Sequence, residues 1–394
     1  MDFALTEDQL ALAAATRRFA KDVLAPGAVE RTRQPSYPFD IARKLAAQGL
    51  LGITIAGADG GQSGTVLEAI IVIQAVAEVC PRSADVIQAA NFGAIRTLAE
   101  YGSAHLKRKY LGPLLAGDAV LALGMTEAEA GSAVTDLRTT ARQDADRVVI
   151  NGGKVFSSHS ADAELFLVYV RFGPGADGIG SVLIERDTAG FTVGKPASFM
   201  SGERWCPLYF DNTVIPADNI VLGTGGFKRQ ITAFNVERLG NAARSLALGR
   251  LAFNKAREHA LSRHQFGRPL AEFQGIQWKF ADMAAKLESA QLLLYRAAWA
   301  AGQAMPSAYD TALAKLASNT AGFEVSNEAL QVMGGTGYTQ ESLVEYCVRR
   351  TRGWMIAGGS TEMMKNRIAE SIFDRRFSQR LPVPSGYEPI GYEG

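Results

Sequence analysis

Cysteine and histidine are scarce in this sequence. Of its 394 residues, three are cysteine and four are histidine. Cys80, Cys206 and Cys347 lie far apart and form no C-x-x-C pair, which excludes a disulfide framework and argues against a zinc site. The histidines form no H-x-x-H pair, so we expect no metal ion. We therefore expect a protein of a reducing compartment, the cytoplasm.

A net charge of one sign and a long apolar run are also lacking. The 41 lysines and arginines balance 40 acidic residues, so no global attraction to nucleic acid or to an anionic membrane is expected. The most apolar stretch, 69–79, is interrupted by Gln74 and Glu78 and is too short to cross a bilayer. No basic segment followed by an apolar run marks a secretory signal. The basic pair Arg349 and Arg350 is expected on a solvated surface.

The composition is that of an ordinary globular protein. Apolar residues make up 47% and charged residues 21%, which excludes a disordered chain, a collagen-like repeat and a coiled-coil rod. The length corresponds to two or three domains at about 150 residues each. Residues 1–121 have helical patterns, 122–230 have short strand patterns, and 231–394 have helical patterns again. The predicted fold class is therefore α+β, with three domains bounded in this way.

The central segment has the pattern of an antiparallel barrel or sandwich. Its β-rich runs follow one another without helices between them, which is typical of antiparallel rather than parallel sheets. Residues 147–150 and 154–156 are predicted as two strands, joined by a tight turn at 151–153 where two glycines occur.

Helical spacing is clear on both sides of this segment. Thr6 and Gln9 have the spacing of a capping box at a helix start. After residue 270, two apolar stripes recur every three or four residues and are predicted to face the core. The first stripe is formed by Ile276, Phe280, Met283, Leu287, Ala290 and Leu294, and the second begins with Leu313, Leu316, Thr320 and Phe323.

Three glycine-containing motifs could bind a ligand, and each also has a plain structural interpretation. The loop 124–132 can offer backbone N–H groups to a polar ring system, or is a hydrophilic connector. The segment 263–267 places an arginine beside a glycine turn, which suits phosphate, or is an exposed basic helix end. The segment 331–338 can form an anion-binding nest, or is a glycine C-cap.

Two further motifs concern a carboxylate and a helix start. Glu237 shares a helix face with Ala233 and Phe234, and burial there would raise its pKa towards that of a useful base. The plain interpretation is an exposed or arginine-paired glutamate. In segment 355–364, paired glycines precede Ser360, which suits a helix N-cap with free N–H groups.

The order of these motifs resembles that of the acyl-CoA dehydrogenase family over essentially the whole chain. The first matches the family's T-E-P-x-A-G-S-D loop, with Ala128 and Ala133 in place of proline and aspartate. The other matches are Asn151-Gly152-x-Lys154 for N-G-x-K, Arg263-x-x-Phe266-Gly267 with Phe273-Gln274 for R-x-x-F-G and its later Q, and Gly334-Gly335-x-Gly337-Tyr338 for G-G-x-G-Y.

The resemblance implies helical, β and helical domains, the last a four-helix bundle, around FAD in a homotetramer. Beside the flavin ring it implies Met125, Thr126, Ser132, Phe156 and Ser158, with Phe156 and Ser158 replacing the usual Trp and Thr. It implies that Arg263 and Phe266 of a neighbouring subunit, with Gln331, Gly334 and Gly335, hold the pyrophosphate and adenosine. It implies further cofactor contacts at Gln274, Ser360 and Glu362, and substrate contacts at Ser132, Asn235 and Arg238.

The family's reaction is the α,β-dehydrogenation of an acyl thioester, in lipid metabolism. A base removes the α-proton while a hydride leaves the β-carbon for flavin N5, and the electrons pass to an electron-transfer flavoprotein or a similar acceptor. Many members carry the base in a Y-E-G-T-S motif, but here Gly358 occupies the acidic position. A branch that includes isovaleryl- and long-chain-type enzymes has it in E-R-L, which Glu237-Arg238-Leu239 matches. The resemblance thus implies Glu237 as base, with the Gly358 N–H binding the thioester oxygen.

Alternatives to this function follow from the same resemblance. Some relatives are oxidases or monooxygenases that activate oxygen and need no thioester. The thioester could belong to a carrier protein rather than to CoA. A non-enzymatic flavin scaffold or a nucleic-acid-associated homologue is a third alternative, against which the net charge of +1 argues.

Overall fold

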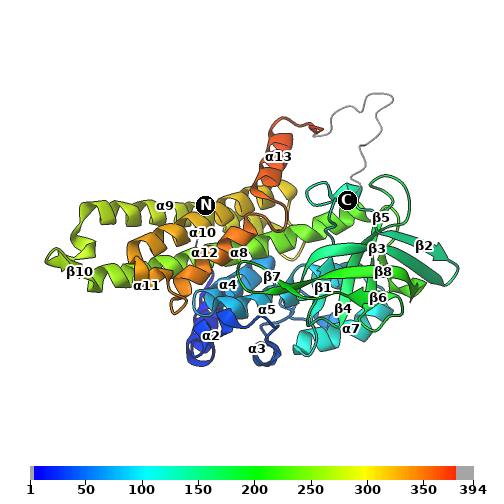
Figure 1. Cartoon of the computed structure of the whole chain (residues 1–394), viewed down its shortest axis with the longest axis horizontal. Helices are drawn as coiled ribbons and strands as arrows, with labels where there is room; N and C mark the ends of the chain where they lie inside the picture. Colours follow the sequence, from blue (N-terminus) through cyan, green and yellow to red (C-terminus); the bar gives the residue numbers. More distant parts are fainter. Residues whose placement is uncertain (1–3, 379–394) are drawn as a thin grey trace.

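The computed structural model describes residues 4–378. Along the chain, one group of helices precedes the strands of a large sheet and a second group follows them (Figure 1). The helices before the sheet are α1 (Glu7–Phe19), α2 (Ala28–Arg33), α3 (Phe39–Ala46), α4 (Val66–Ala77), α5 (Pro81–Asn91), α6 (Ala94–Tyr101) and α7 (Ala104–Ala116). Those after it are α8 (Phe227–Ser262), α9 (Gln274–Ala301), α10 (Ala308–Met333), α11 (Gly335–Tyr338), α12 (Leu343–Trp354) and α13 (Thr361–Ile372). A π-helical turn (Ala20–Leu24) extends α1, and short 3-10 turns occupy Gly57–Asp59, Val134–Asp136, Ala217–Asn219 and Leu270–Glu272.

The strands form a nine-stranded sheet and a small hairpin. The sheet contains β1 (Leu121–Gly124), β2 (Thr140–Asp144), β3 (Arg147–Ser158), β4 (Leu165–Arg171), β5 (Ile179–Glu185), β6 (Phe191–Val193), β7 (Ala197–Ser198), β8 (Arg204–Pro216) and β9 (Ile220–Leu222). The hairpin pairs β10 (His264–Gln265) with β11 (Arg268–Pro269). The main path is β6-β8-β3-β2-β4-β5-β9, with β1 beside β4 and β7 beside β8.

This sheet differs from the predicted antiparallel barrel or sandwich in two ways. The described strands form a path with two ends, β6 and β9, so residues 4–378 show no closed barrel. The sheet is also mixed, since β1 and β2 each pair in parallel with β4. A parallel pair needs a long connection. Between β1 and β4 that connection contains β2 and β3, which a pattern of successive short strands does not reveal.

The predicted hairpin around residues 151–153 is wrong. Residues 147–158 form the single strand β3, which pairs with β8 and has a register shift between Ile150 and Gly152. Gly152 has φ +138°, and a Cβ there would lie 2.7 Å from the Cα of Thr139. The glycine therefore permits a bulge and a close backbone approach rather than a turn. The chain turns earlier, at Ala145 (φ +49°), between β2 and β3.

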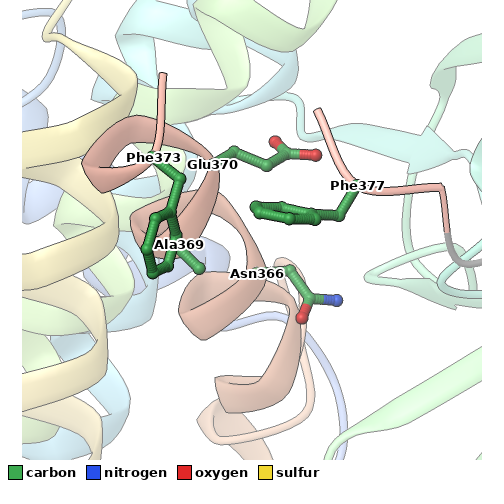
Figure 2. Close-up of a pocket in the computed structure, with 5 residues that line it drawn as sticks. All are labelled: Asn366, Ala369, Glu370, Phe373 and Phe377. Carbon is green, nitrogen blue, oxygen red and sulfur yellow. The ribbon is translucent and has the colours of Figure 1, made fainter. Parts of the chain in front are cut away.

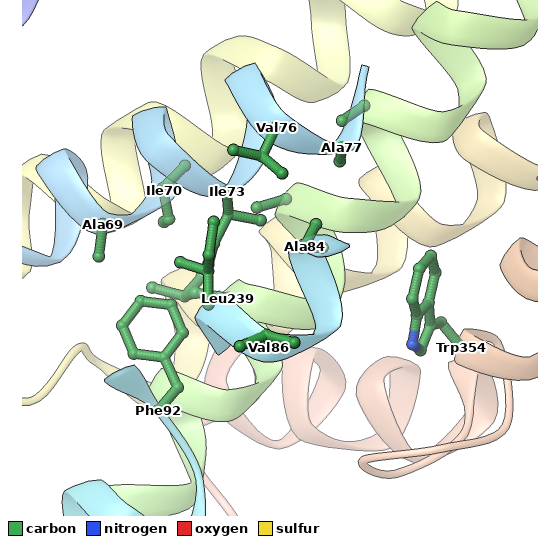
Figure 3. Close-up of a cluster of buried hydrophobic side chains, with 14 of the residues drawn as sticks. Ala69, Ile70, Ile73, Val76, Ala77, Ala84, Val86, Phe92, Leu239 and Trp354 are labelled. Atoms are coloured by element: carbon green, nitrogen blue, oxygen red, sulfur yellow. The ribbon is translucent and has the colours of Figure 1, made fainter. Parts of the chain in front are cut away.

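Helices from both ends of the chain share one apolar core. α8 packs against α4, α5, α9, α10 and α12. Figure 3 shows side chains of α4 (Ile70, Ile73 and Val76) beside Val86 of α5 and Leu239 of α8. Because the apolar faces of the N-terminal helices are covered by α8, the two helical segments form one body.

The long C-terminal helices confirm one predicted stripe and correct the other. In α9, Met283, Leu287, Ala290 and Leu294 are buried, while Ile276 and Phe280 are partly buried against the core. In α10, the four residues of the second stripe are only half-buried. The buried face of α10 contains small residues such as Ala314, Ser318 and Gly322. Small side chains let α10 approach α8 closely. A search for large apolar residues at helical spacing does not detect such a face.

No helix within residues 4–378 is both long enough and apolar enough to span a bilayer. The same residues contain no group of three or more histidine, cysteine, aspartate or glutamate side chains that could hold a metal ion. Cys80, Cys206 and Cys347 are buried free thiols. The capping box of Thr6 and Gln9 is present at the start of α1.

Candidate active site

Glu237 lies in α8 and faces the N-terminal helices. Nε2 of Gln88, in α5, donates a hydrogen bond to its Oε1. The carboxylate is partly exposed, so a substrate can reach it. Burial raises the pKa of Glu237 to about 7, although Arg244 and the hydrogen bond from Gln88 act in the opposite direction. A carboxyl group with this pKa is a competent general base near neutral pH.

Glu237 begins a stripe of polar side chains between α5 and α8. On α8 it is followed by Asn241 and Arg244, one and two turns further along the same face. On α5 the facing residues are Arg82, Asp85 and Gln88, again at helical spacing, and each is 2% exposed. We call these six residues the polar seam. Its presence behind the carboxylate means that the base is supported by hydrogen-bonding and charged groups rather than by aliphatic side chains.

The far end of the polar seam belongs to a buried ion cluster that joins all three parts of the chain. Asp85 pairs with Arg82 at 2.8 Å, with Arg350 of α12 at 3.3 Å, and with Arg244. Glu203, which precedes β8, pairs with Arg350 at 3.3 Å. Burial alone would raise the pKa of Asp85, but the three arginines together hold it well below its usual range.

The expected solvated position of Arg350 is therefore wrong. Its guanidinium is a member of this ion cluster and also lies 4.7 Å from the ring centroid of Trp354. Arg349 is paired with Glu345 at 2.6 Å and is partly buried. Two adjacent arginines on a helix resemble a basic surface in a sequence, but Arg349 pairs with Glu345 on the same helix and Arg350 pairs with acidic residues of distant elements.

The loop between α12 and α13 is held against the base by buried donors. Nζ of Lys315 and Nδ2 of Asn319, both in α10, donate to the carbonyl of Trp354 at 2.9 and 2.7 Å. Nε of Arg238 donates to the carbonyl of Gly358 at 2.9 Å. Burial lowers the pKa of Lys315 to about 7. These contacts fix the peptide groups of the loop at both of its ends.

Gly358 is brought close to the base by this loop. Its φ is +74°, and a Cβ there would lie 2.9 Å from Nδ2 of Asn241. Within residues 4–378 its N–H donates to no protein acceptor, so it is available to a ligand oxygen. Asn241 thus occupies the space that an acidic side chain at position 358 would need. The structure brings Glu237 and Gly358 together through Gln88 and Asn241.

Asn235 and Arg238, predicted to bind substrate, engage protein groups. Nη1 of Arg238 donates to Oδ1 of Asn235 at 2.7 Å, in addition to its bond with Gly358. Nδ2 of Asn235 donates to the carbonyl of Pro306. Both side chains therefore support the loop that carries Gly358.

An apolar surface on the β domain lies near this site. Phe156 is 55% exposed, and its ring lies 4.7 Å from that of Trp205. Trp205 follows Glu203 of the ion cluster by two positions, so the surface adjoins the far end of the polar seam. Met200 is 62% exposed and is next to Phe199, whose ring also contacts Trp205. Exposed apolar side chains of this kind can cover one side of a flat ring system.

The loop between β1 and β2 is clamped to the sheet by a buried ion pair. Nζ of Lys154 lies 2.6 Å from Oε1 of Glu127, and Glu127 also accepts hydrogen bonds from the backbone N–H of Arg138 and from Thr139. Burial lowers the pKa of Lys154 to about 8, and Glu127 opposes that shift. The clamp joins Glu127 of the T-E motif to Lys154 of the N-G-x-K motif. Met125 and Thr126, predicted flavin contacts, are thereby fixed half-buried beside β3.

The remaining predicted residues near this surface are accessible. Ser132 and Ser158 are exposed. Ser360 is the N-cap of α13 and accepts a hydrogen bond from Met363 N, which confirms the predicted helix start. Glu362 lies exposed in the first turn of that helix.

A second set of predicted cofactor residues lies far from the base. Arg263 and Phe266 follow the end of α8, and the 26 residues from Glu237 to Arg263 correspond to roughly 39 Å of helix. Figure 1 shows their hairpin at the opposite end of the long axis from the sheet. Phe266 is 93% exposed. Gln274, Gln331, Gly334 and Gly335 are exposed near the ends of α9 and α10. Within one chain, the residues near Glu237 and the residues near Arg263 are too far apart to contact the same small ligand.

Two surface hollows lie apart from these residues. One, of about 290 Å³, is lined by Asn366, Ala369 and Glu370 of α13 together with Phe373 and Phe377 (Figure 2). The other, of about 530 Å³, is lined by residues of β2 and of the β4–β5 connection. Neither includes a predicted site residue.

Comparison with known proteins accounts for this arrangement. The acyl-CoA dehydrogenase N-terminal domain matches residues 6–118, its middle domain matches 122–213, and its C-terminal domain matches 224–373. The chain belongs to the acyl-CoA dehydrogenase family. It is 34% identical to 3-sulfinopropanoyl-CoA desulfinase of Paraburkholderia xenovorans, over 96% of this chain and 99% of that protein.

Solved structures of the acyl-CoA dehydrogenase fold agree with this assignment. Butyryl-CoA dehydrogenase from Megasphaera elsdenii matches with a TM-score of 0.89 and 30% identity, over 95% of this chain and 100% of that one. The FAD complex of PigA matches with a TM-score of 0.90 and 27% identity, over 95% and 99%. The activity of this chain is FAD-dependent dehydrogenation of acyl-CoA, an oxidoreductase reaction at a CH–CH bond.

FAD is the cofactor of this acyl-CoA dehydrogenase, and the residues present fit it. The exposed ring of Phe156 and the exposed Met200 provide an apolar face for a flavin ring. At the distant end, Gly334 and Gly335 have open space where a Cβ would lie, so a phosphate could approach the backbone.

Most of the groups that surround Glu237 belong to none of the sequence motifs described above. Gln88, Asn241 and Arg244 were not singled out, nor were Lys315 and Asp85. A usable signal does exist, because polar residues recur at helical spacing in α5 and α8 within otherwise apolar helices. A row of polar residues on a buried helix indicates that another element faces it with polar groups. The sequence does not show which element that is.

Proposed function

We propose that Glu237 is the base of this acyl-CoA dehydrogenase. One observation carries the proposal: its carboxylate is only partly exposed at the start of the polar seam, and this burial raises its pKa to about 7. Gly358 stands where the Y-E-G-T-S motif has its glutamate, so this position supplies no base. Asn241 fills the space beside Gly358. Both features favour the branch with E-R-L in the helix.

In this mechanism Glu237 takes the α-proton and the Gly358 N–H binds the thioester oxygen. A donor at that oxygen stabilises the negative charge that develops as the proton leaves. Lys315, Asn319 and Arg238 hold the loop so that this N–H stays in place. FAD, when bound, accepts the hydride that leaves the β-carbon.

The test is the holoenzyme of Glu237→Gln. A general base contributes about 10² to 10⁴-fold, so turnover should fall at least about 100-fold while FAD stays bound. The matched control is Glu324→Gln, because Glu324 lies on the exposed surface of α10 in a pair with Lys286. We also expect kcat/KM of the unaltered enzyme to fall about tenfold per pH unit below about pH 7, since the protonated carboxyl cannot accept a proton. Near-normal turnover of Glu237→Gln would exclude this role.

We further propose a short acyl chain as the substrate group. The side chains next to the carboxylate, Gln88 and Asn241, are amides, and a long alkyl chain would gain little by burial against them. The relatives act on short acyl groups, as the names butyryl-CoA and 3-sulfinopropanoyl-CoA state. Anaerobic flavin bleaching should be faster with butyryl-CoA than with palmitoyl-CoA, and the reverse order would contradict the proposal.

The same anaerobic assay separates the alternatives. Bleaching by CoA thioesters without oxygen supports the dehydrogenase, and oxygen consumption without any thioester supports an oxidase or monooxygenase. Bleaching only by carrier-bound thioesters would show that the substrate is a thioester of a carrier protein rather than of CoA. We propose an electron-transfer flavoprotein or a similar protein as the acceptor, so reoxidation by such a protein should outpace reoxidation by oxygen.

We also propose a homotetramer in which FAD lies between subunits. The roughly 39 Å between Glu237 and Arg263 supports this, as does the exposure of Phe266 and Trp278, which lie beyond the end of α8 and near the start of α9. We also propose three domains, 1–121, 122–230 and 231–394.

A further inference from the structure

Both N–H groups of the Gln88 amide are used at the active site. Its Nε2 donates to Oε1 of Glu237 and, at 3.1 Å, to Oδ1 of Asn241. Gln88 is 2% exposed, so water cannot replace these partners freely. Its own Oε1 is buried and has no partner within residues 4–378. A buried acceptor without a partner costs about 1–3 kcal/mol, and this orientation of the amide is kept in spite of that cost.

The second oxygen of Glu237 is left free by its surroundings. Oε2 accepts no hydrogen bond from the described residues. It lies against Gly93, where a Cβ would be only 2.8 Å away, and Gly93 has φ +66°. The glycine therefore keeps space next to Oε2 that any other residue would fill. The two oxygens are thus distinguished: one is held by an amide, and the other is open.

The charges around Glu237 favour its ionised form once burial has been overcome. The charged groups that face it from the packed elements are Asp85 on α5, Arg244 on α8, Lys315 on α10 and Arg350 on α12. The buried ion cluster contains three arginines and two carboxylates, which leaves one excess positive charge. An ionised Glu237 next to the cluster balances that charge. A hydrogen bond to the carboxylate adds to this effect.

We propose that Gln88 is a positioning residue for the base: it holds Oε1 of Glu237 so that Oε2 is the oxygen that takes the α-proton. The inference rests on the proposed role of Glu237. In the step, the α-carbon C–H bond breaks, its proton forms a bond to Oε2, and its electron pair stays with the substrate. Oδ1 of Asn241 accepts a second hydrogen bond from the same Nε2, and this limits rotation of the Gln88 amide.

The decisive variant is Gln88→Met in the holoenzyme, which keeps the chain length but removes both hydrogen bonds. Losing a donor to the carboxylate raises its pKa, so the acid limb of kcat/KM with butyryl-CoA should move up by about one pH unit, roughly a tenfold loss below the limb. The matched control is Gln74→Met, because Gln74 is also buried and its side chain, among residues 4–378, bonds only with Gln291, at 2.9 and 3.2 Å. Its acid limb should not move.

A direct reading of the carboxyl group separates this inference from the proposed function. The infrared C=O band of the protonated acid, taken as wild type minus Glu237→Gln, titrates Glu237 without any turnover. In Gln88→Met this titration should shift upward together with the acid limb. Gln88→Asn, too short to reach Oε1, should shift it in the same direction and serves if Gln88→Met does not fold.

An unmoved infrared titration in both variants would overturn the positioning role, whatever the activity. An infrared shift combined with near-normal turnover of Glu237→Gln would instead retain the contact and exclude Glu237 as the base.

Discussion

At the scale of single residues, Glu237 is held in the folded state at a cost. Its carboxylate must give up water, and burial raises its pKa from 4.5 to about 7. A carboxyl with a raised pKa contributes stability that is fully present below its unfolded-state pKa and is lost as the pH rises through the folded-state value. The same property that makes the group a base near neutral pH therefore weakens the fold.

This cost predicts a pH-dependent gain in stability for Glu237→Gln. The amide does not titrate, so the variant should become more stable than the unaltered protein as the pH rises from about 4.5 to about 7, by at most about 3 kcal/mol. Above about pH 8 the difference should stay constant. Urea unfolding across this range measures it, and two parallel stability curves would contradict the shifted pKa.

At the scale of elements, the contact between α8 and α10 depends on small residues. A Cβ on Gly322 would lie 2.3 Å from the carbonyl oxygen of Ser245 and would also meet its hydroxyl. Gly249 approaches Gly322 in the same way, with 3.1 Å from an added Cβ to the Gly322 Cα. The close approach matters for function, because α8 carries Glu237 and α10 carries Lys315, and their spacing decides where the loop with Gly358 lies.

We therefore expect Gly322→Ala to lower the free energy of unfolding by roughly 1–3 kcal/mol, since the added methyl meets backbone that cannot move aside. Gly353→Ala in α12 is the matched control, because nothing lies within 4 Å of its added Cβ. The control should be neutral or gain up to about 1 kcal/mol from helix propensity. Thermal unfolding of both variants gives the comparison, and equal losses would refute close packing at Gly322.

At the scale of the whole molecule, the two sets of cofactor residues lie at opposite ends of one body. The set beside the base is carried by the sheet and the start of α8, and the other by the ends of α8 and α10. Because these ends are joined by rigid helices in one packed core, bending cannot bring them together. If both proposed sets bind FAD, the proposed site requires a second copy of the chain.

Mixing two inactive variants tests this arrangement. Arg263→Ala lacks the distant contact and Glu237→Gln lacks the base, so each assembly alone should have little activity. In mixed assemblies, a subunit with an intact Glu237 can receive Arg263 from its partner. Refolding the two together in equal amounts should restore about one quarter of the normal activity. No recovery, with mixed assembly verified by mass, would mean that Arg263 serves the flavin of its own chain.

Local patterns account for what could be predicted. The capping box at Thr6 and Gln9 and the N-cap at Ser360 depend only on neighbouring residues, and both are present. The stripe from Met283 to Leu294 is buried because a helix places residues three and four apart on one face. The glycines at 152 and 153 could not be assigned from local sequence, since a glycine is equally suited to a turn and to a bulge.

The sequence by itself determined most of the helical segments, the order of the family's motifs, and the presence of glycine rather than an acid at position 358. These depend on residue identity and on spacing along the chain. Only the tertiary structure decided that Gln88 meets Glu237, that Asn241 fills the space beside Gly358, and that Arg350 pairs with Asp85. Each of these contacts joins residues more than a hundred positions apart, and the packing of whole helices, rather than any local pattern, brings them together.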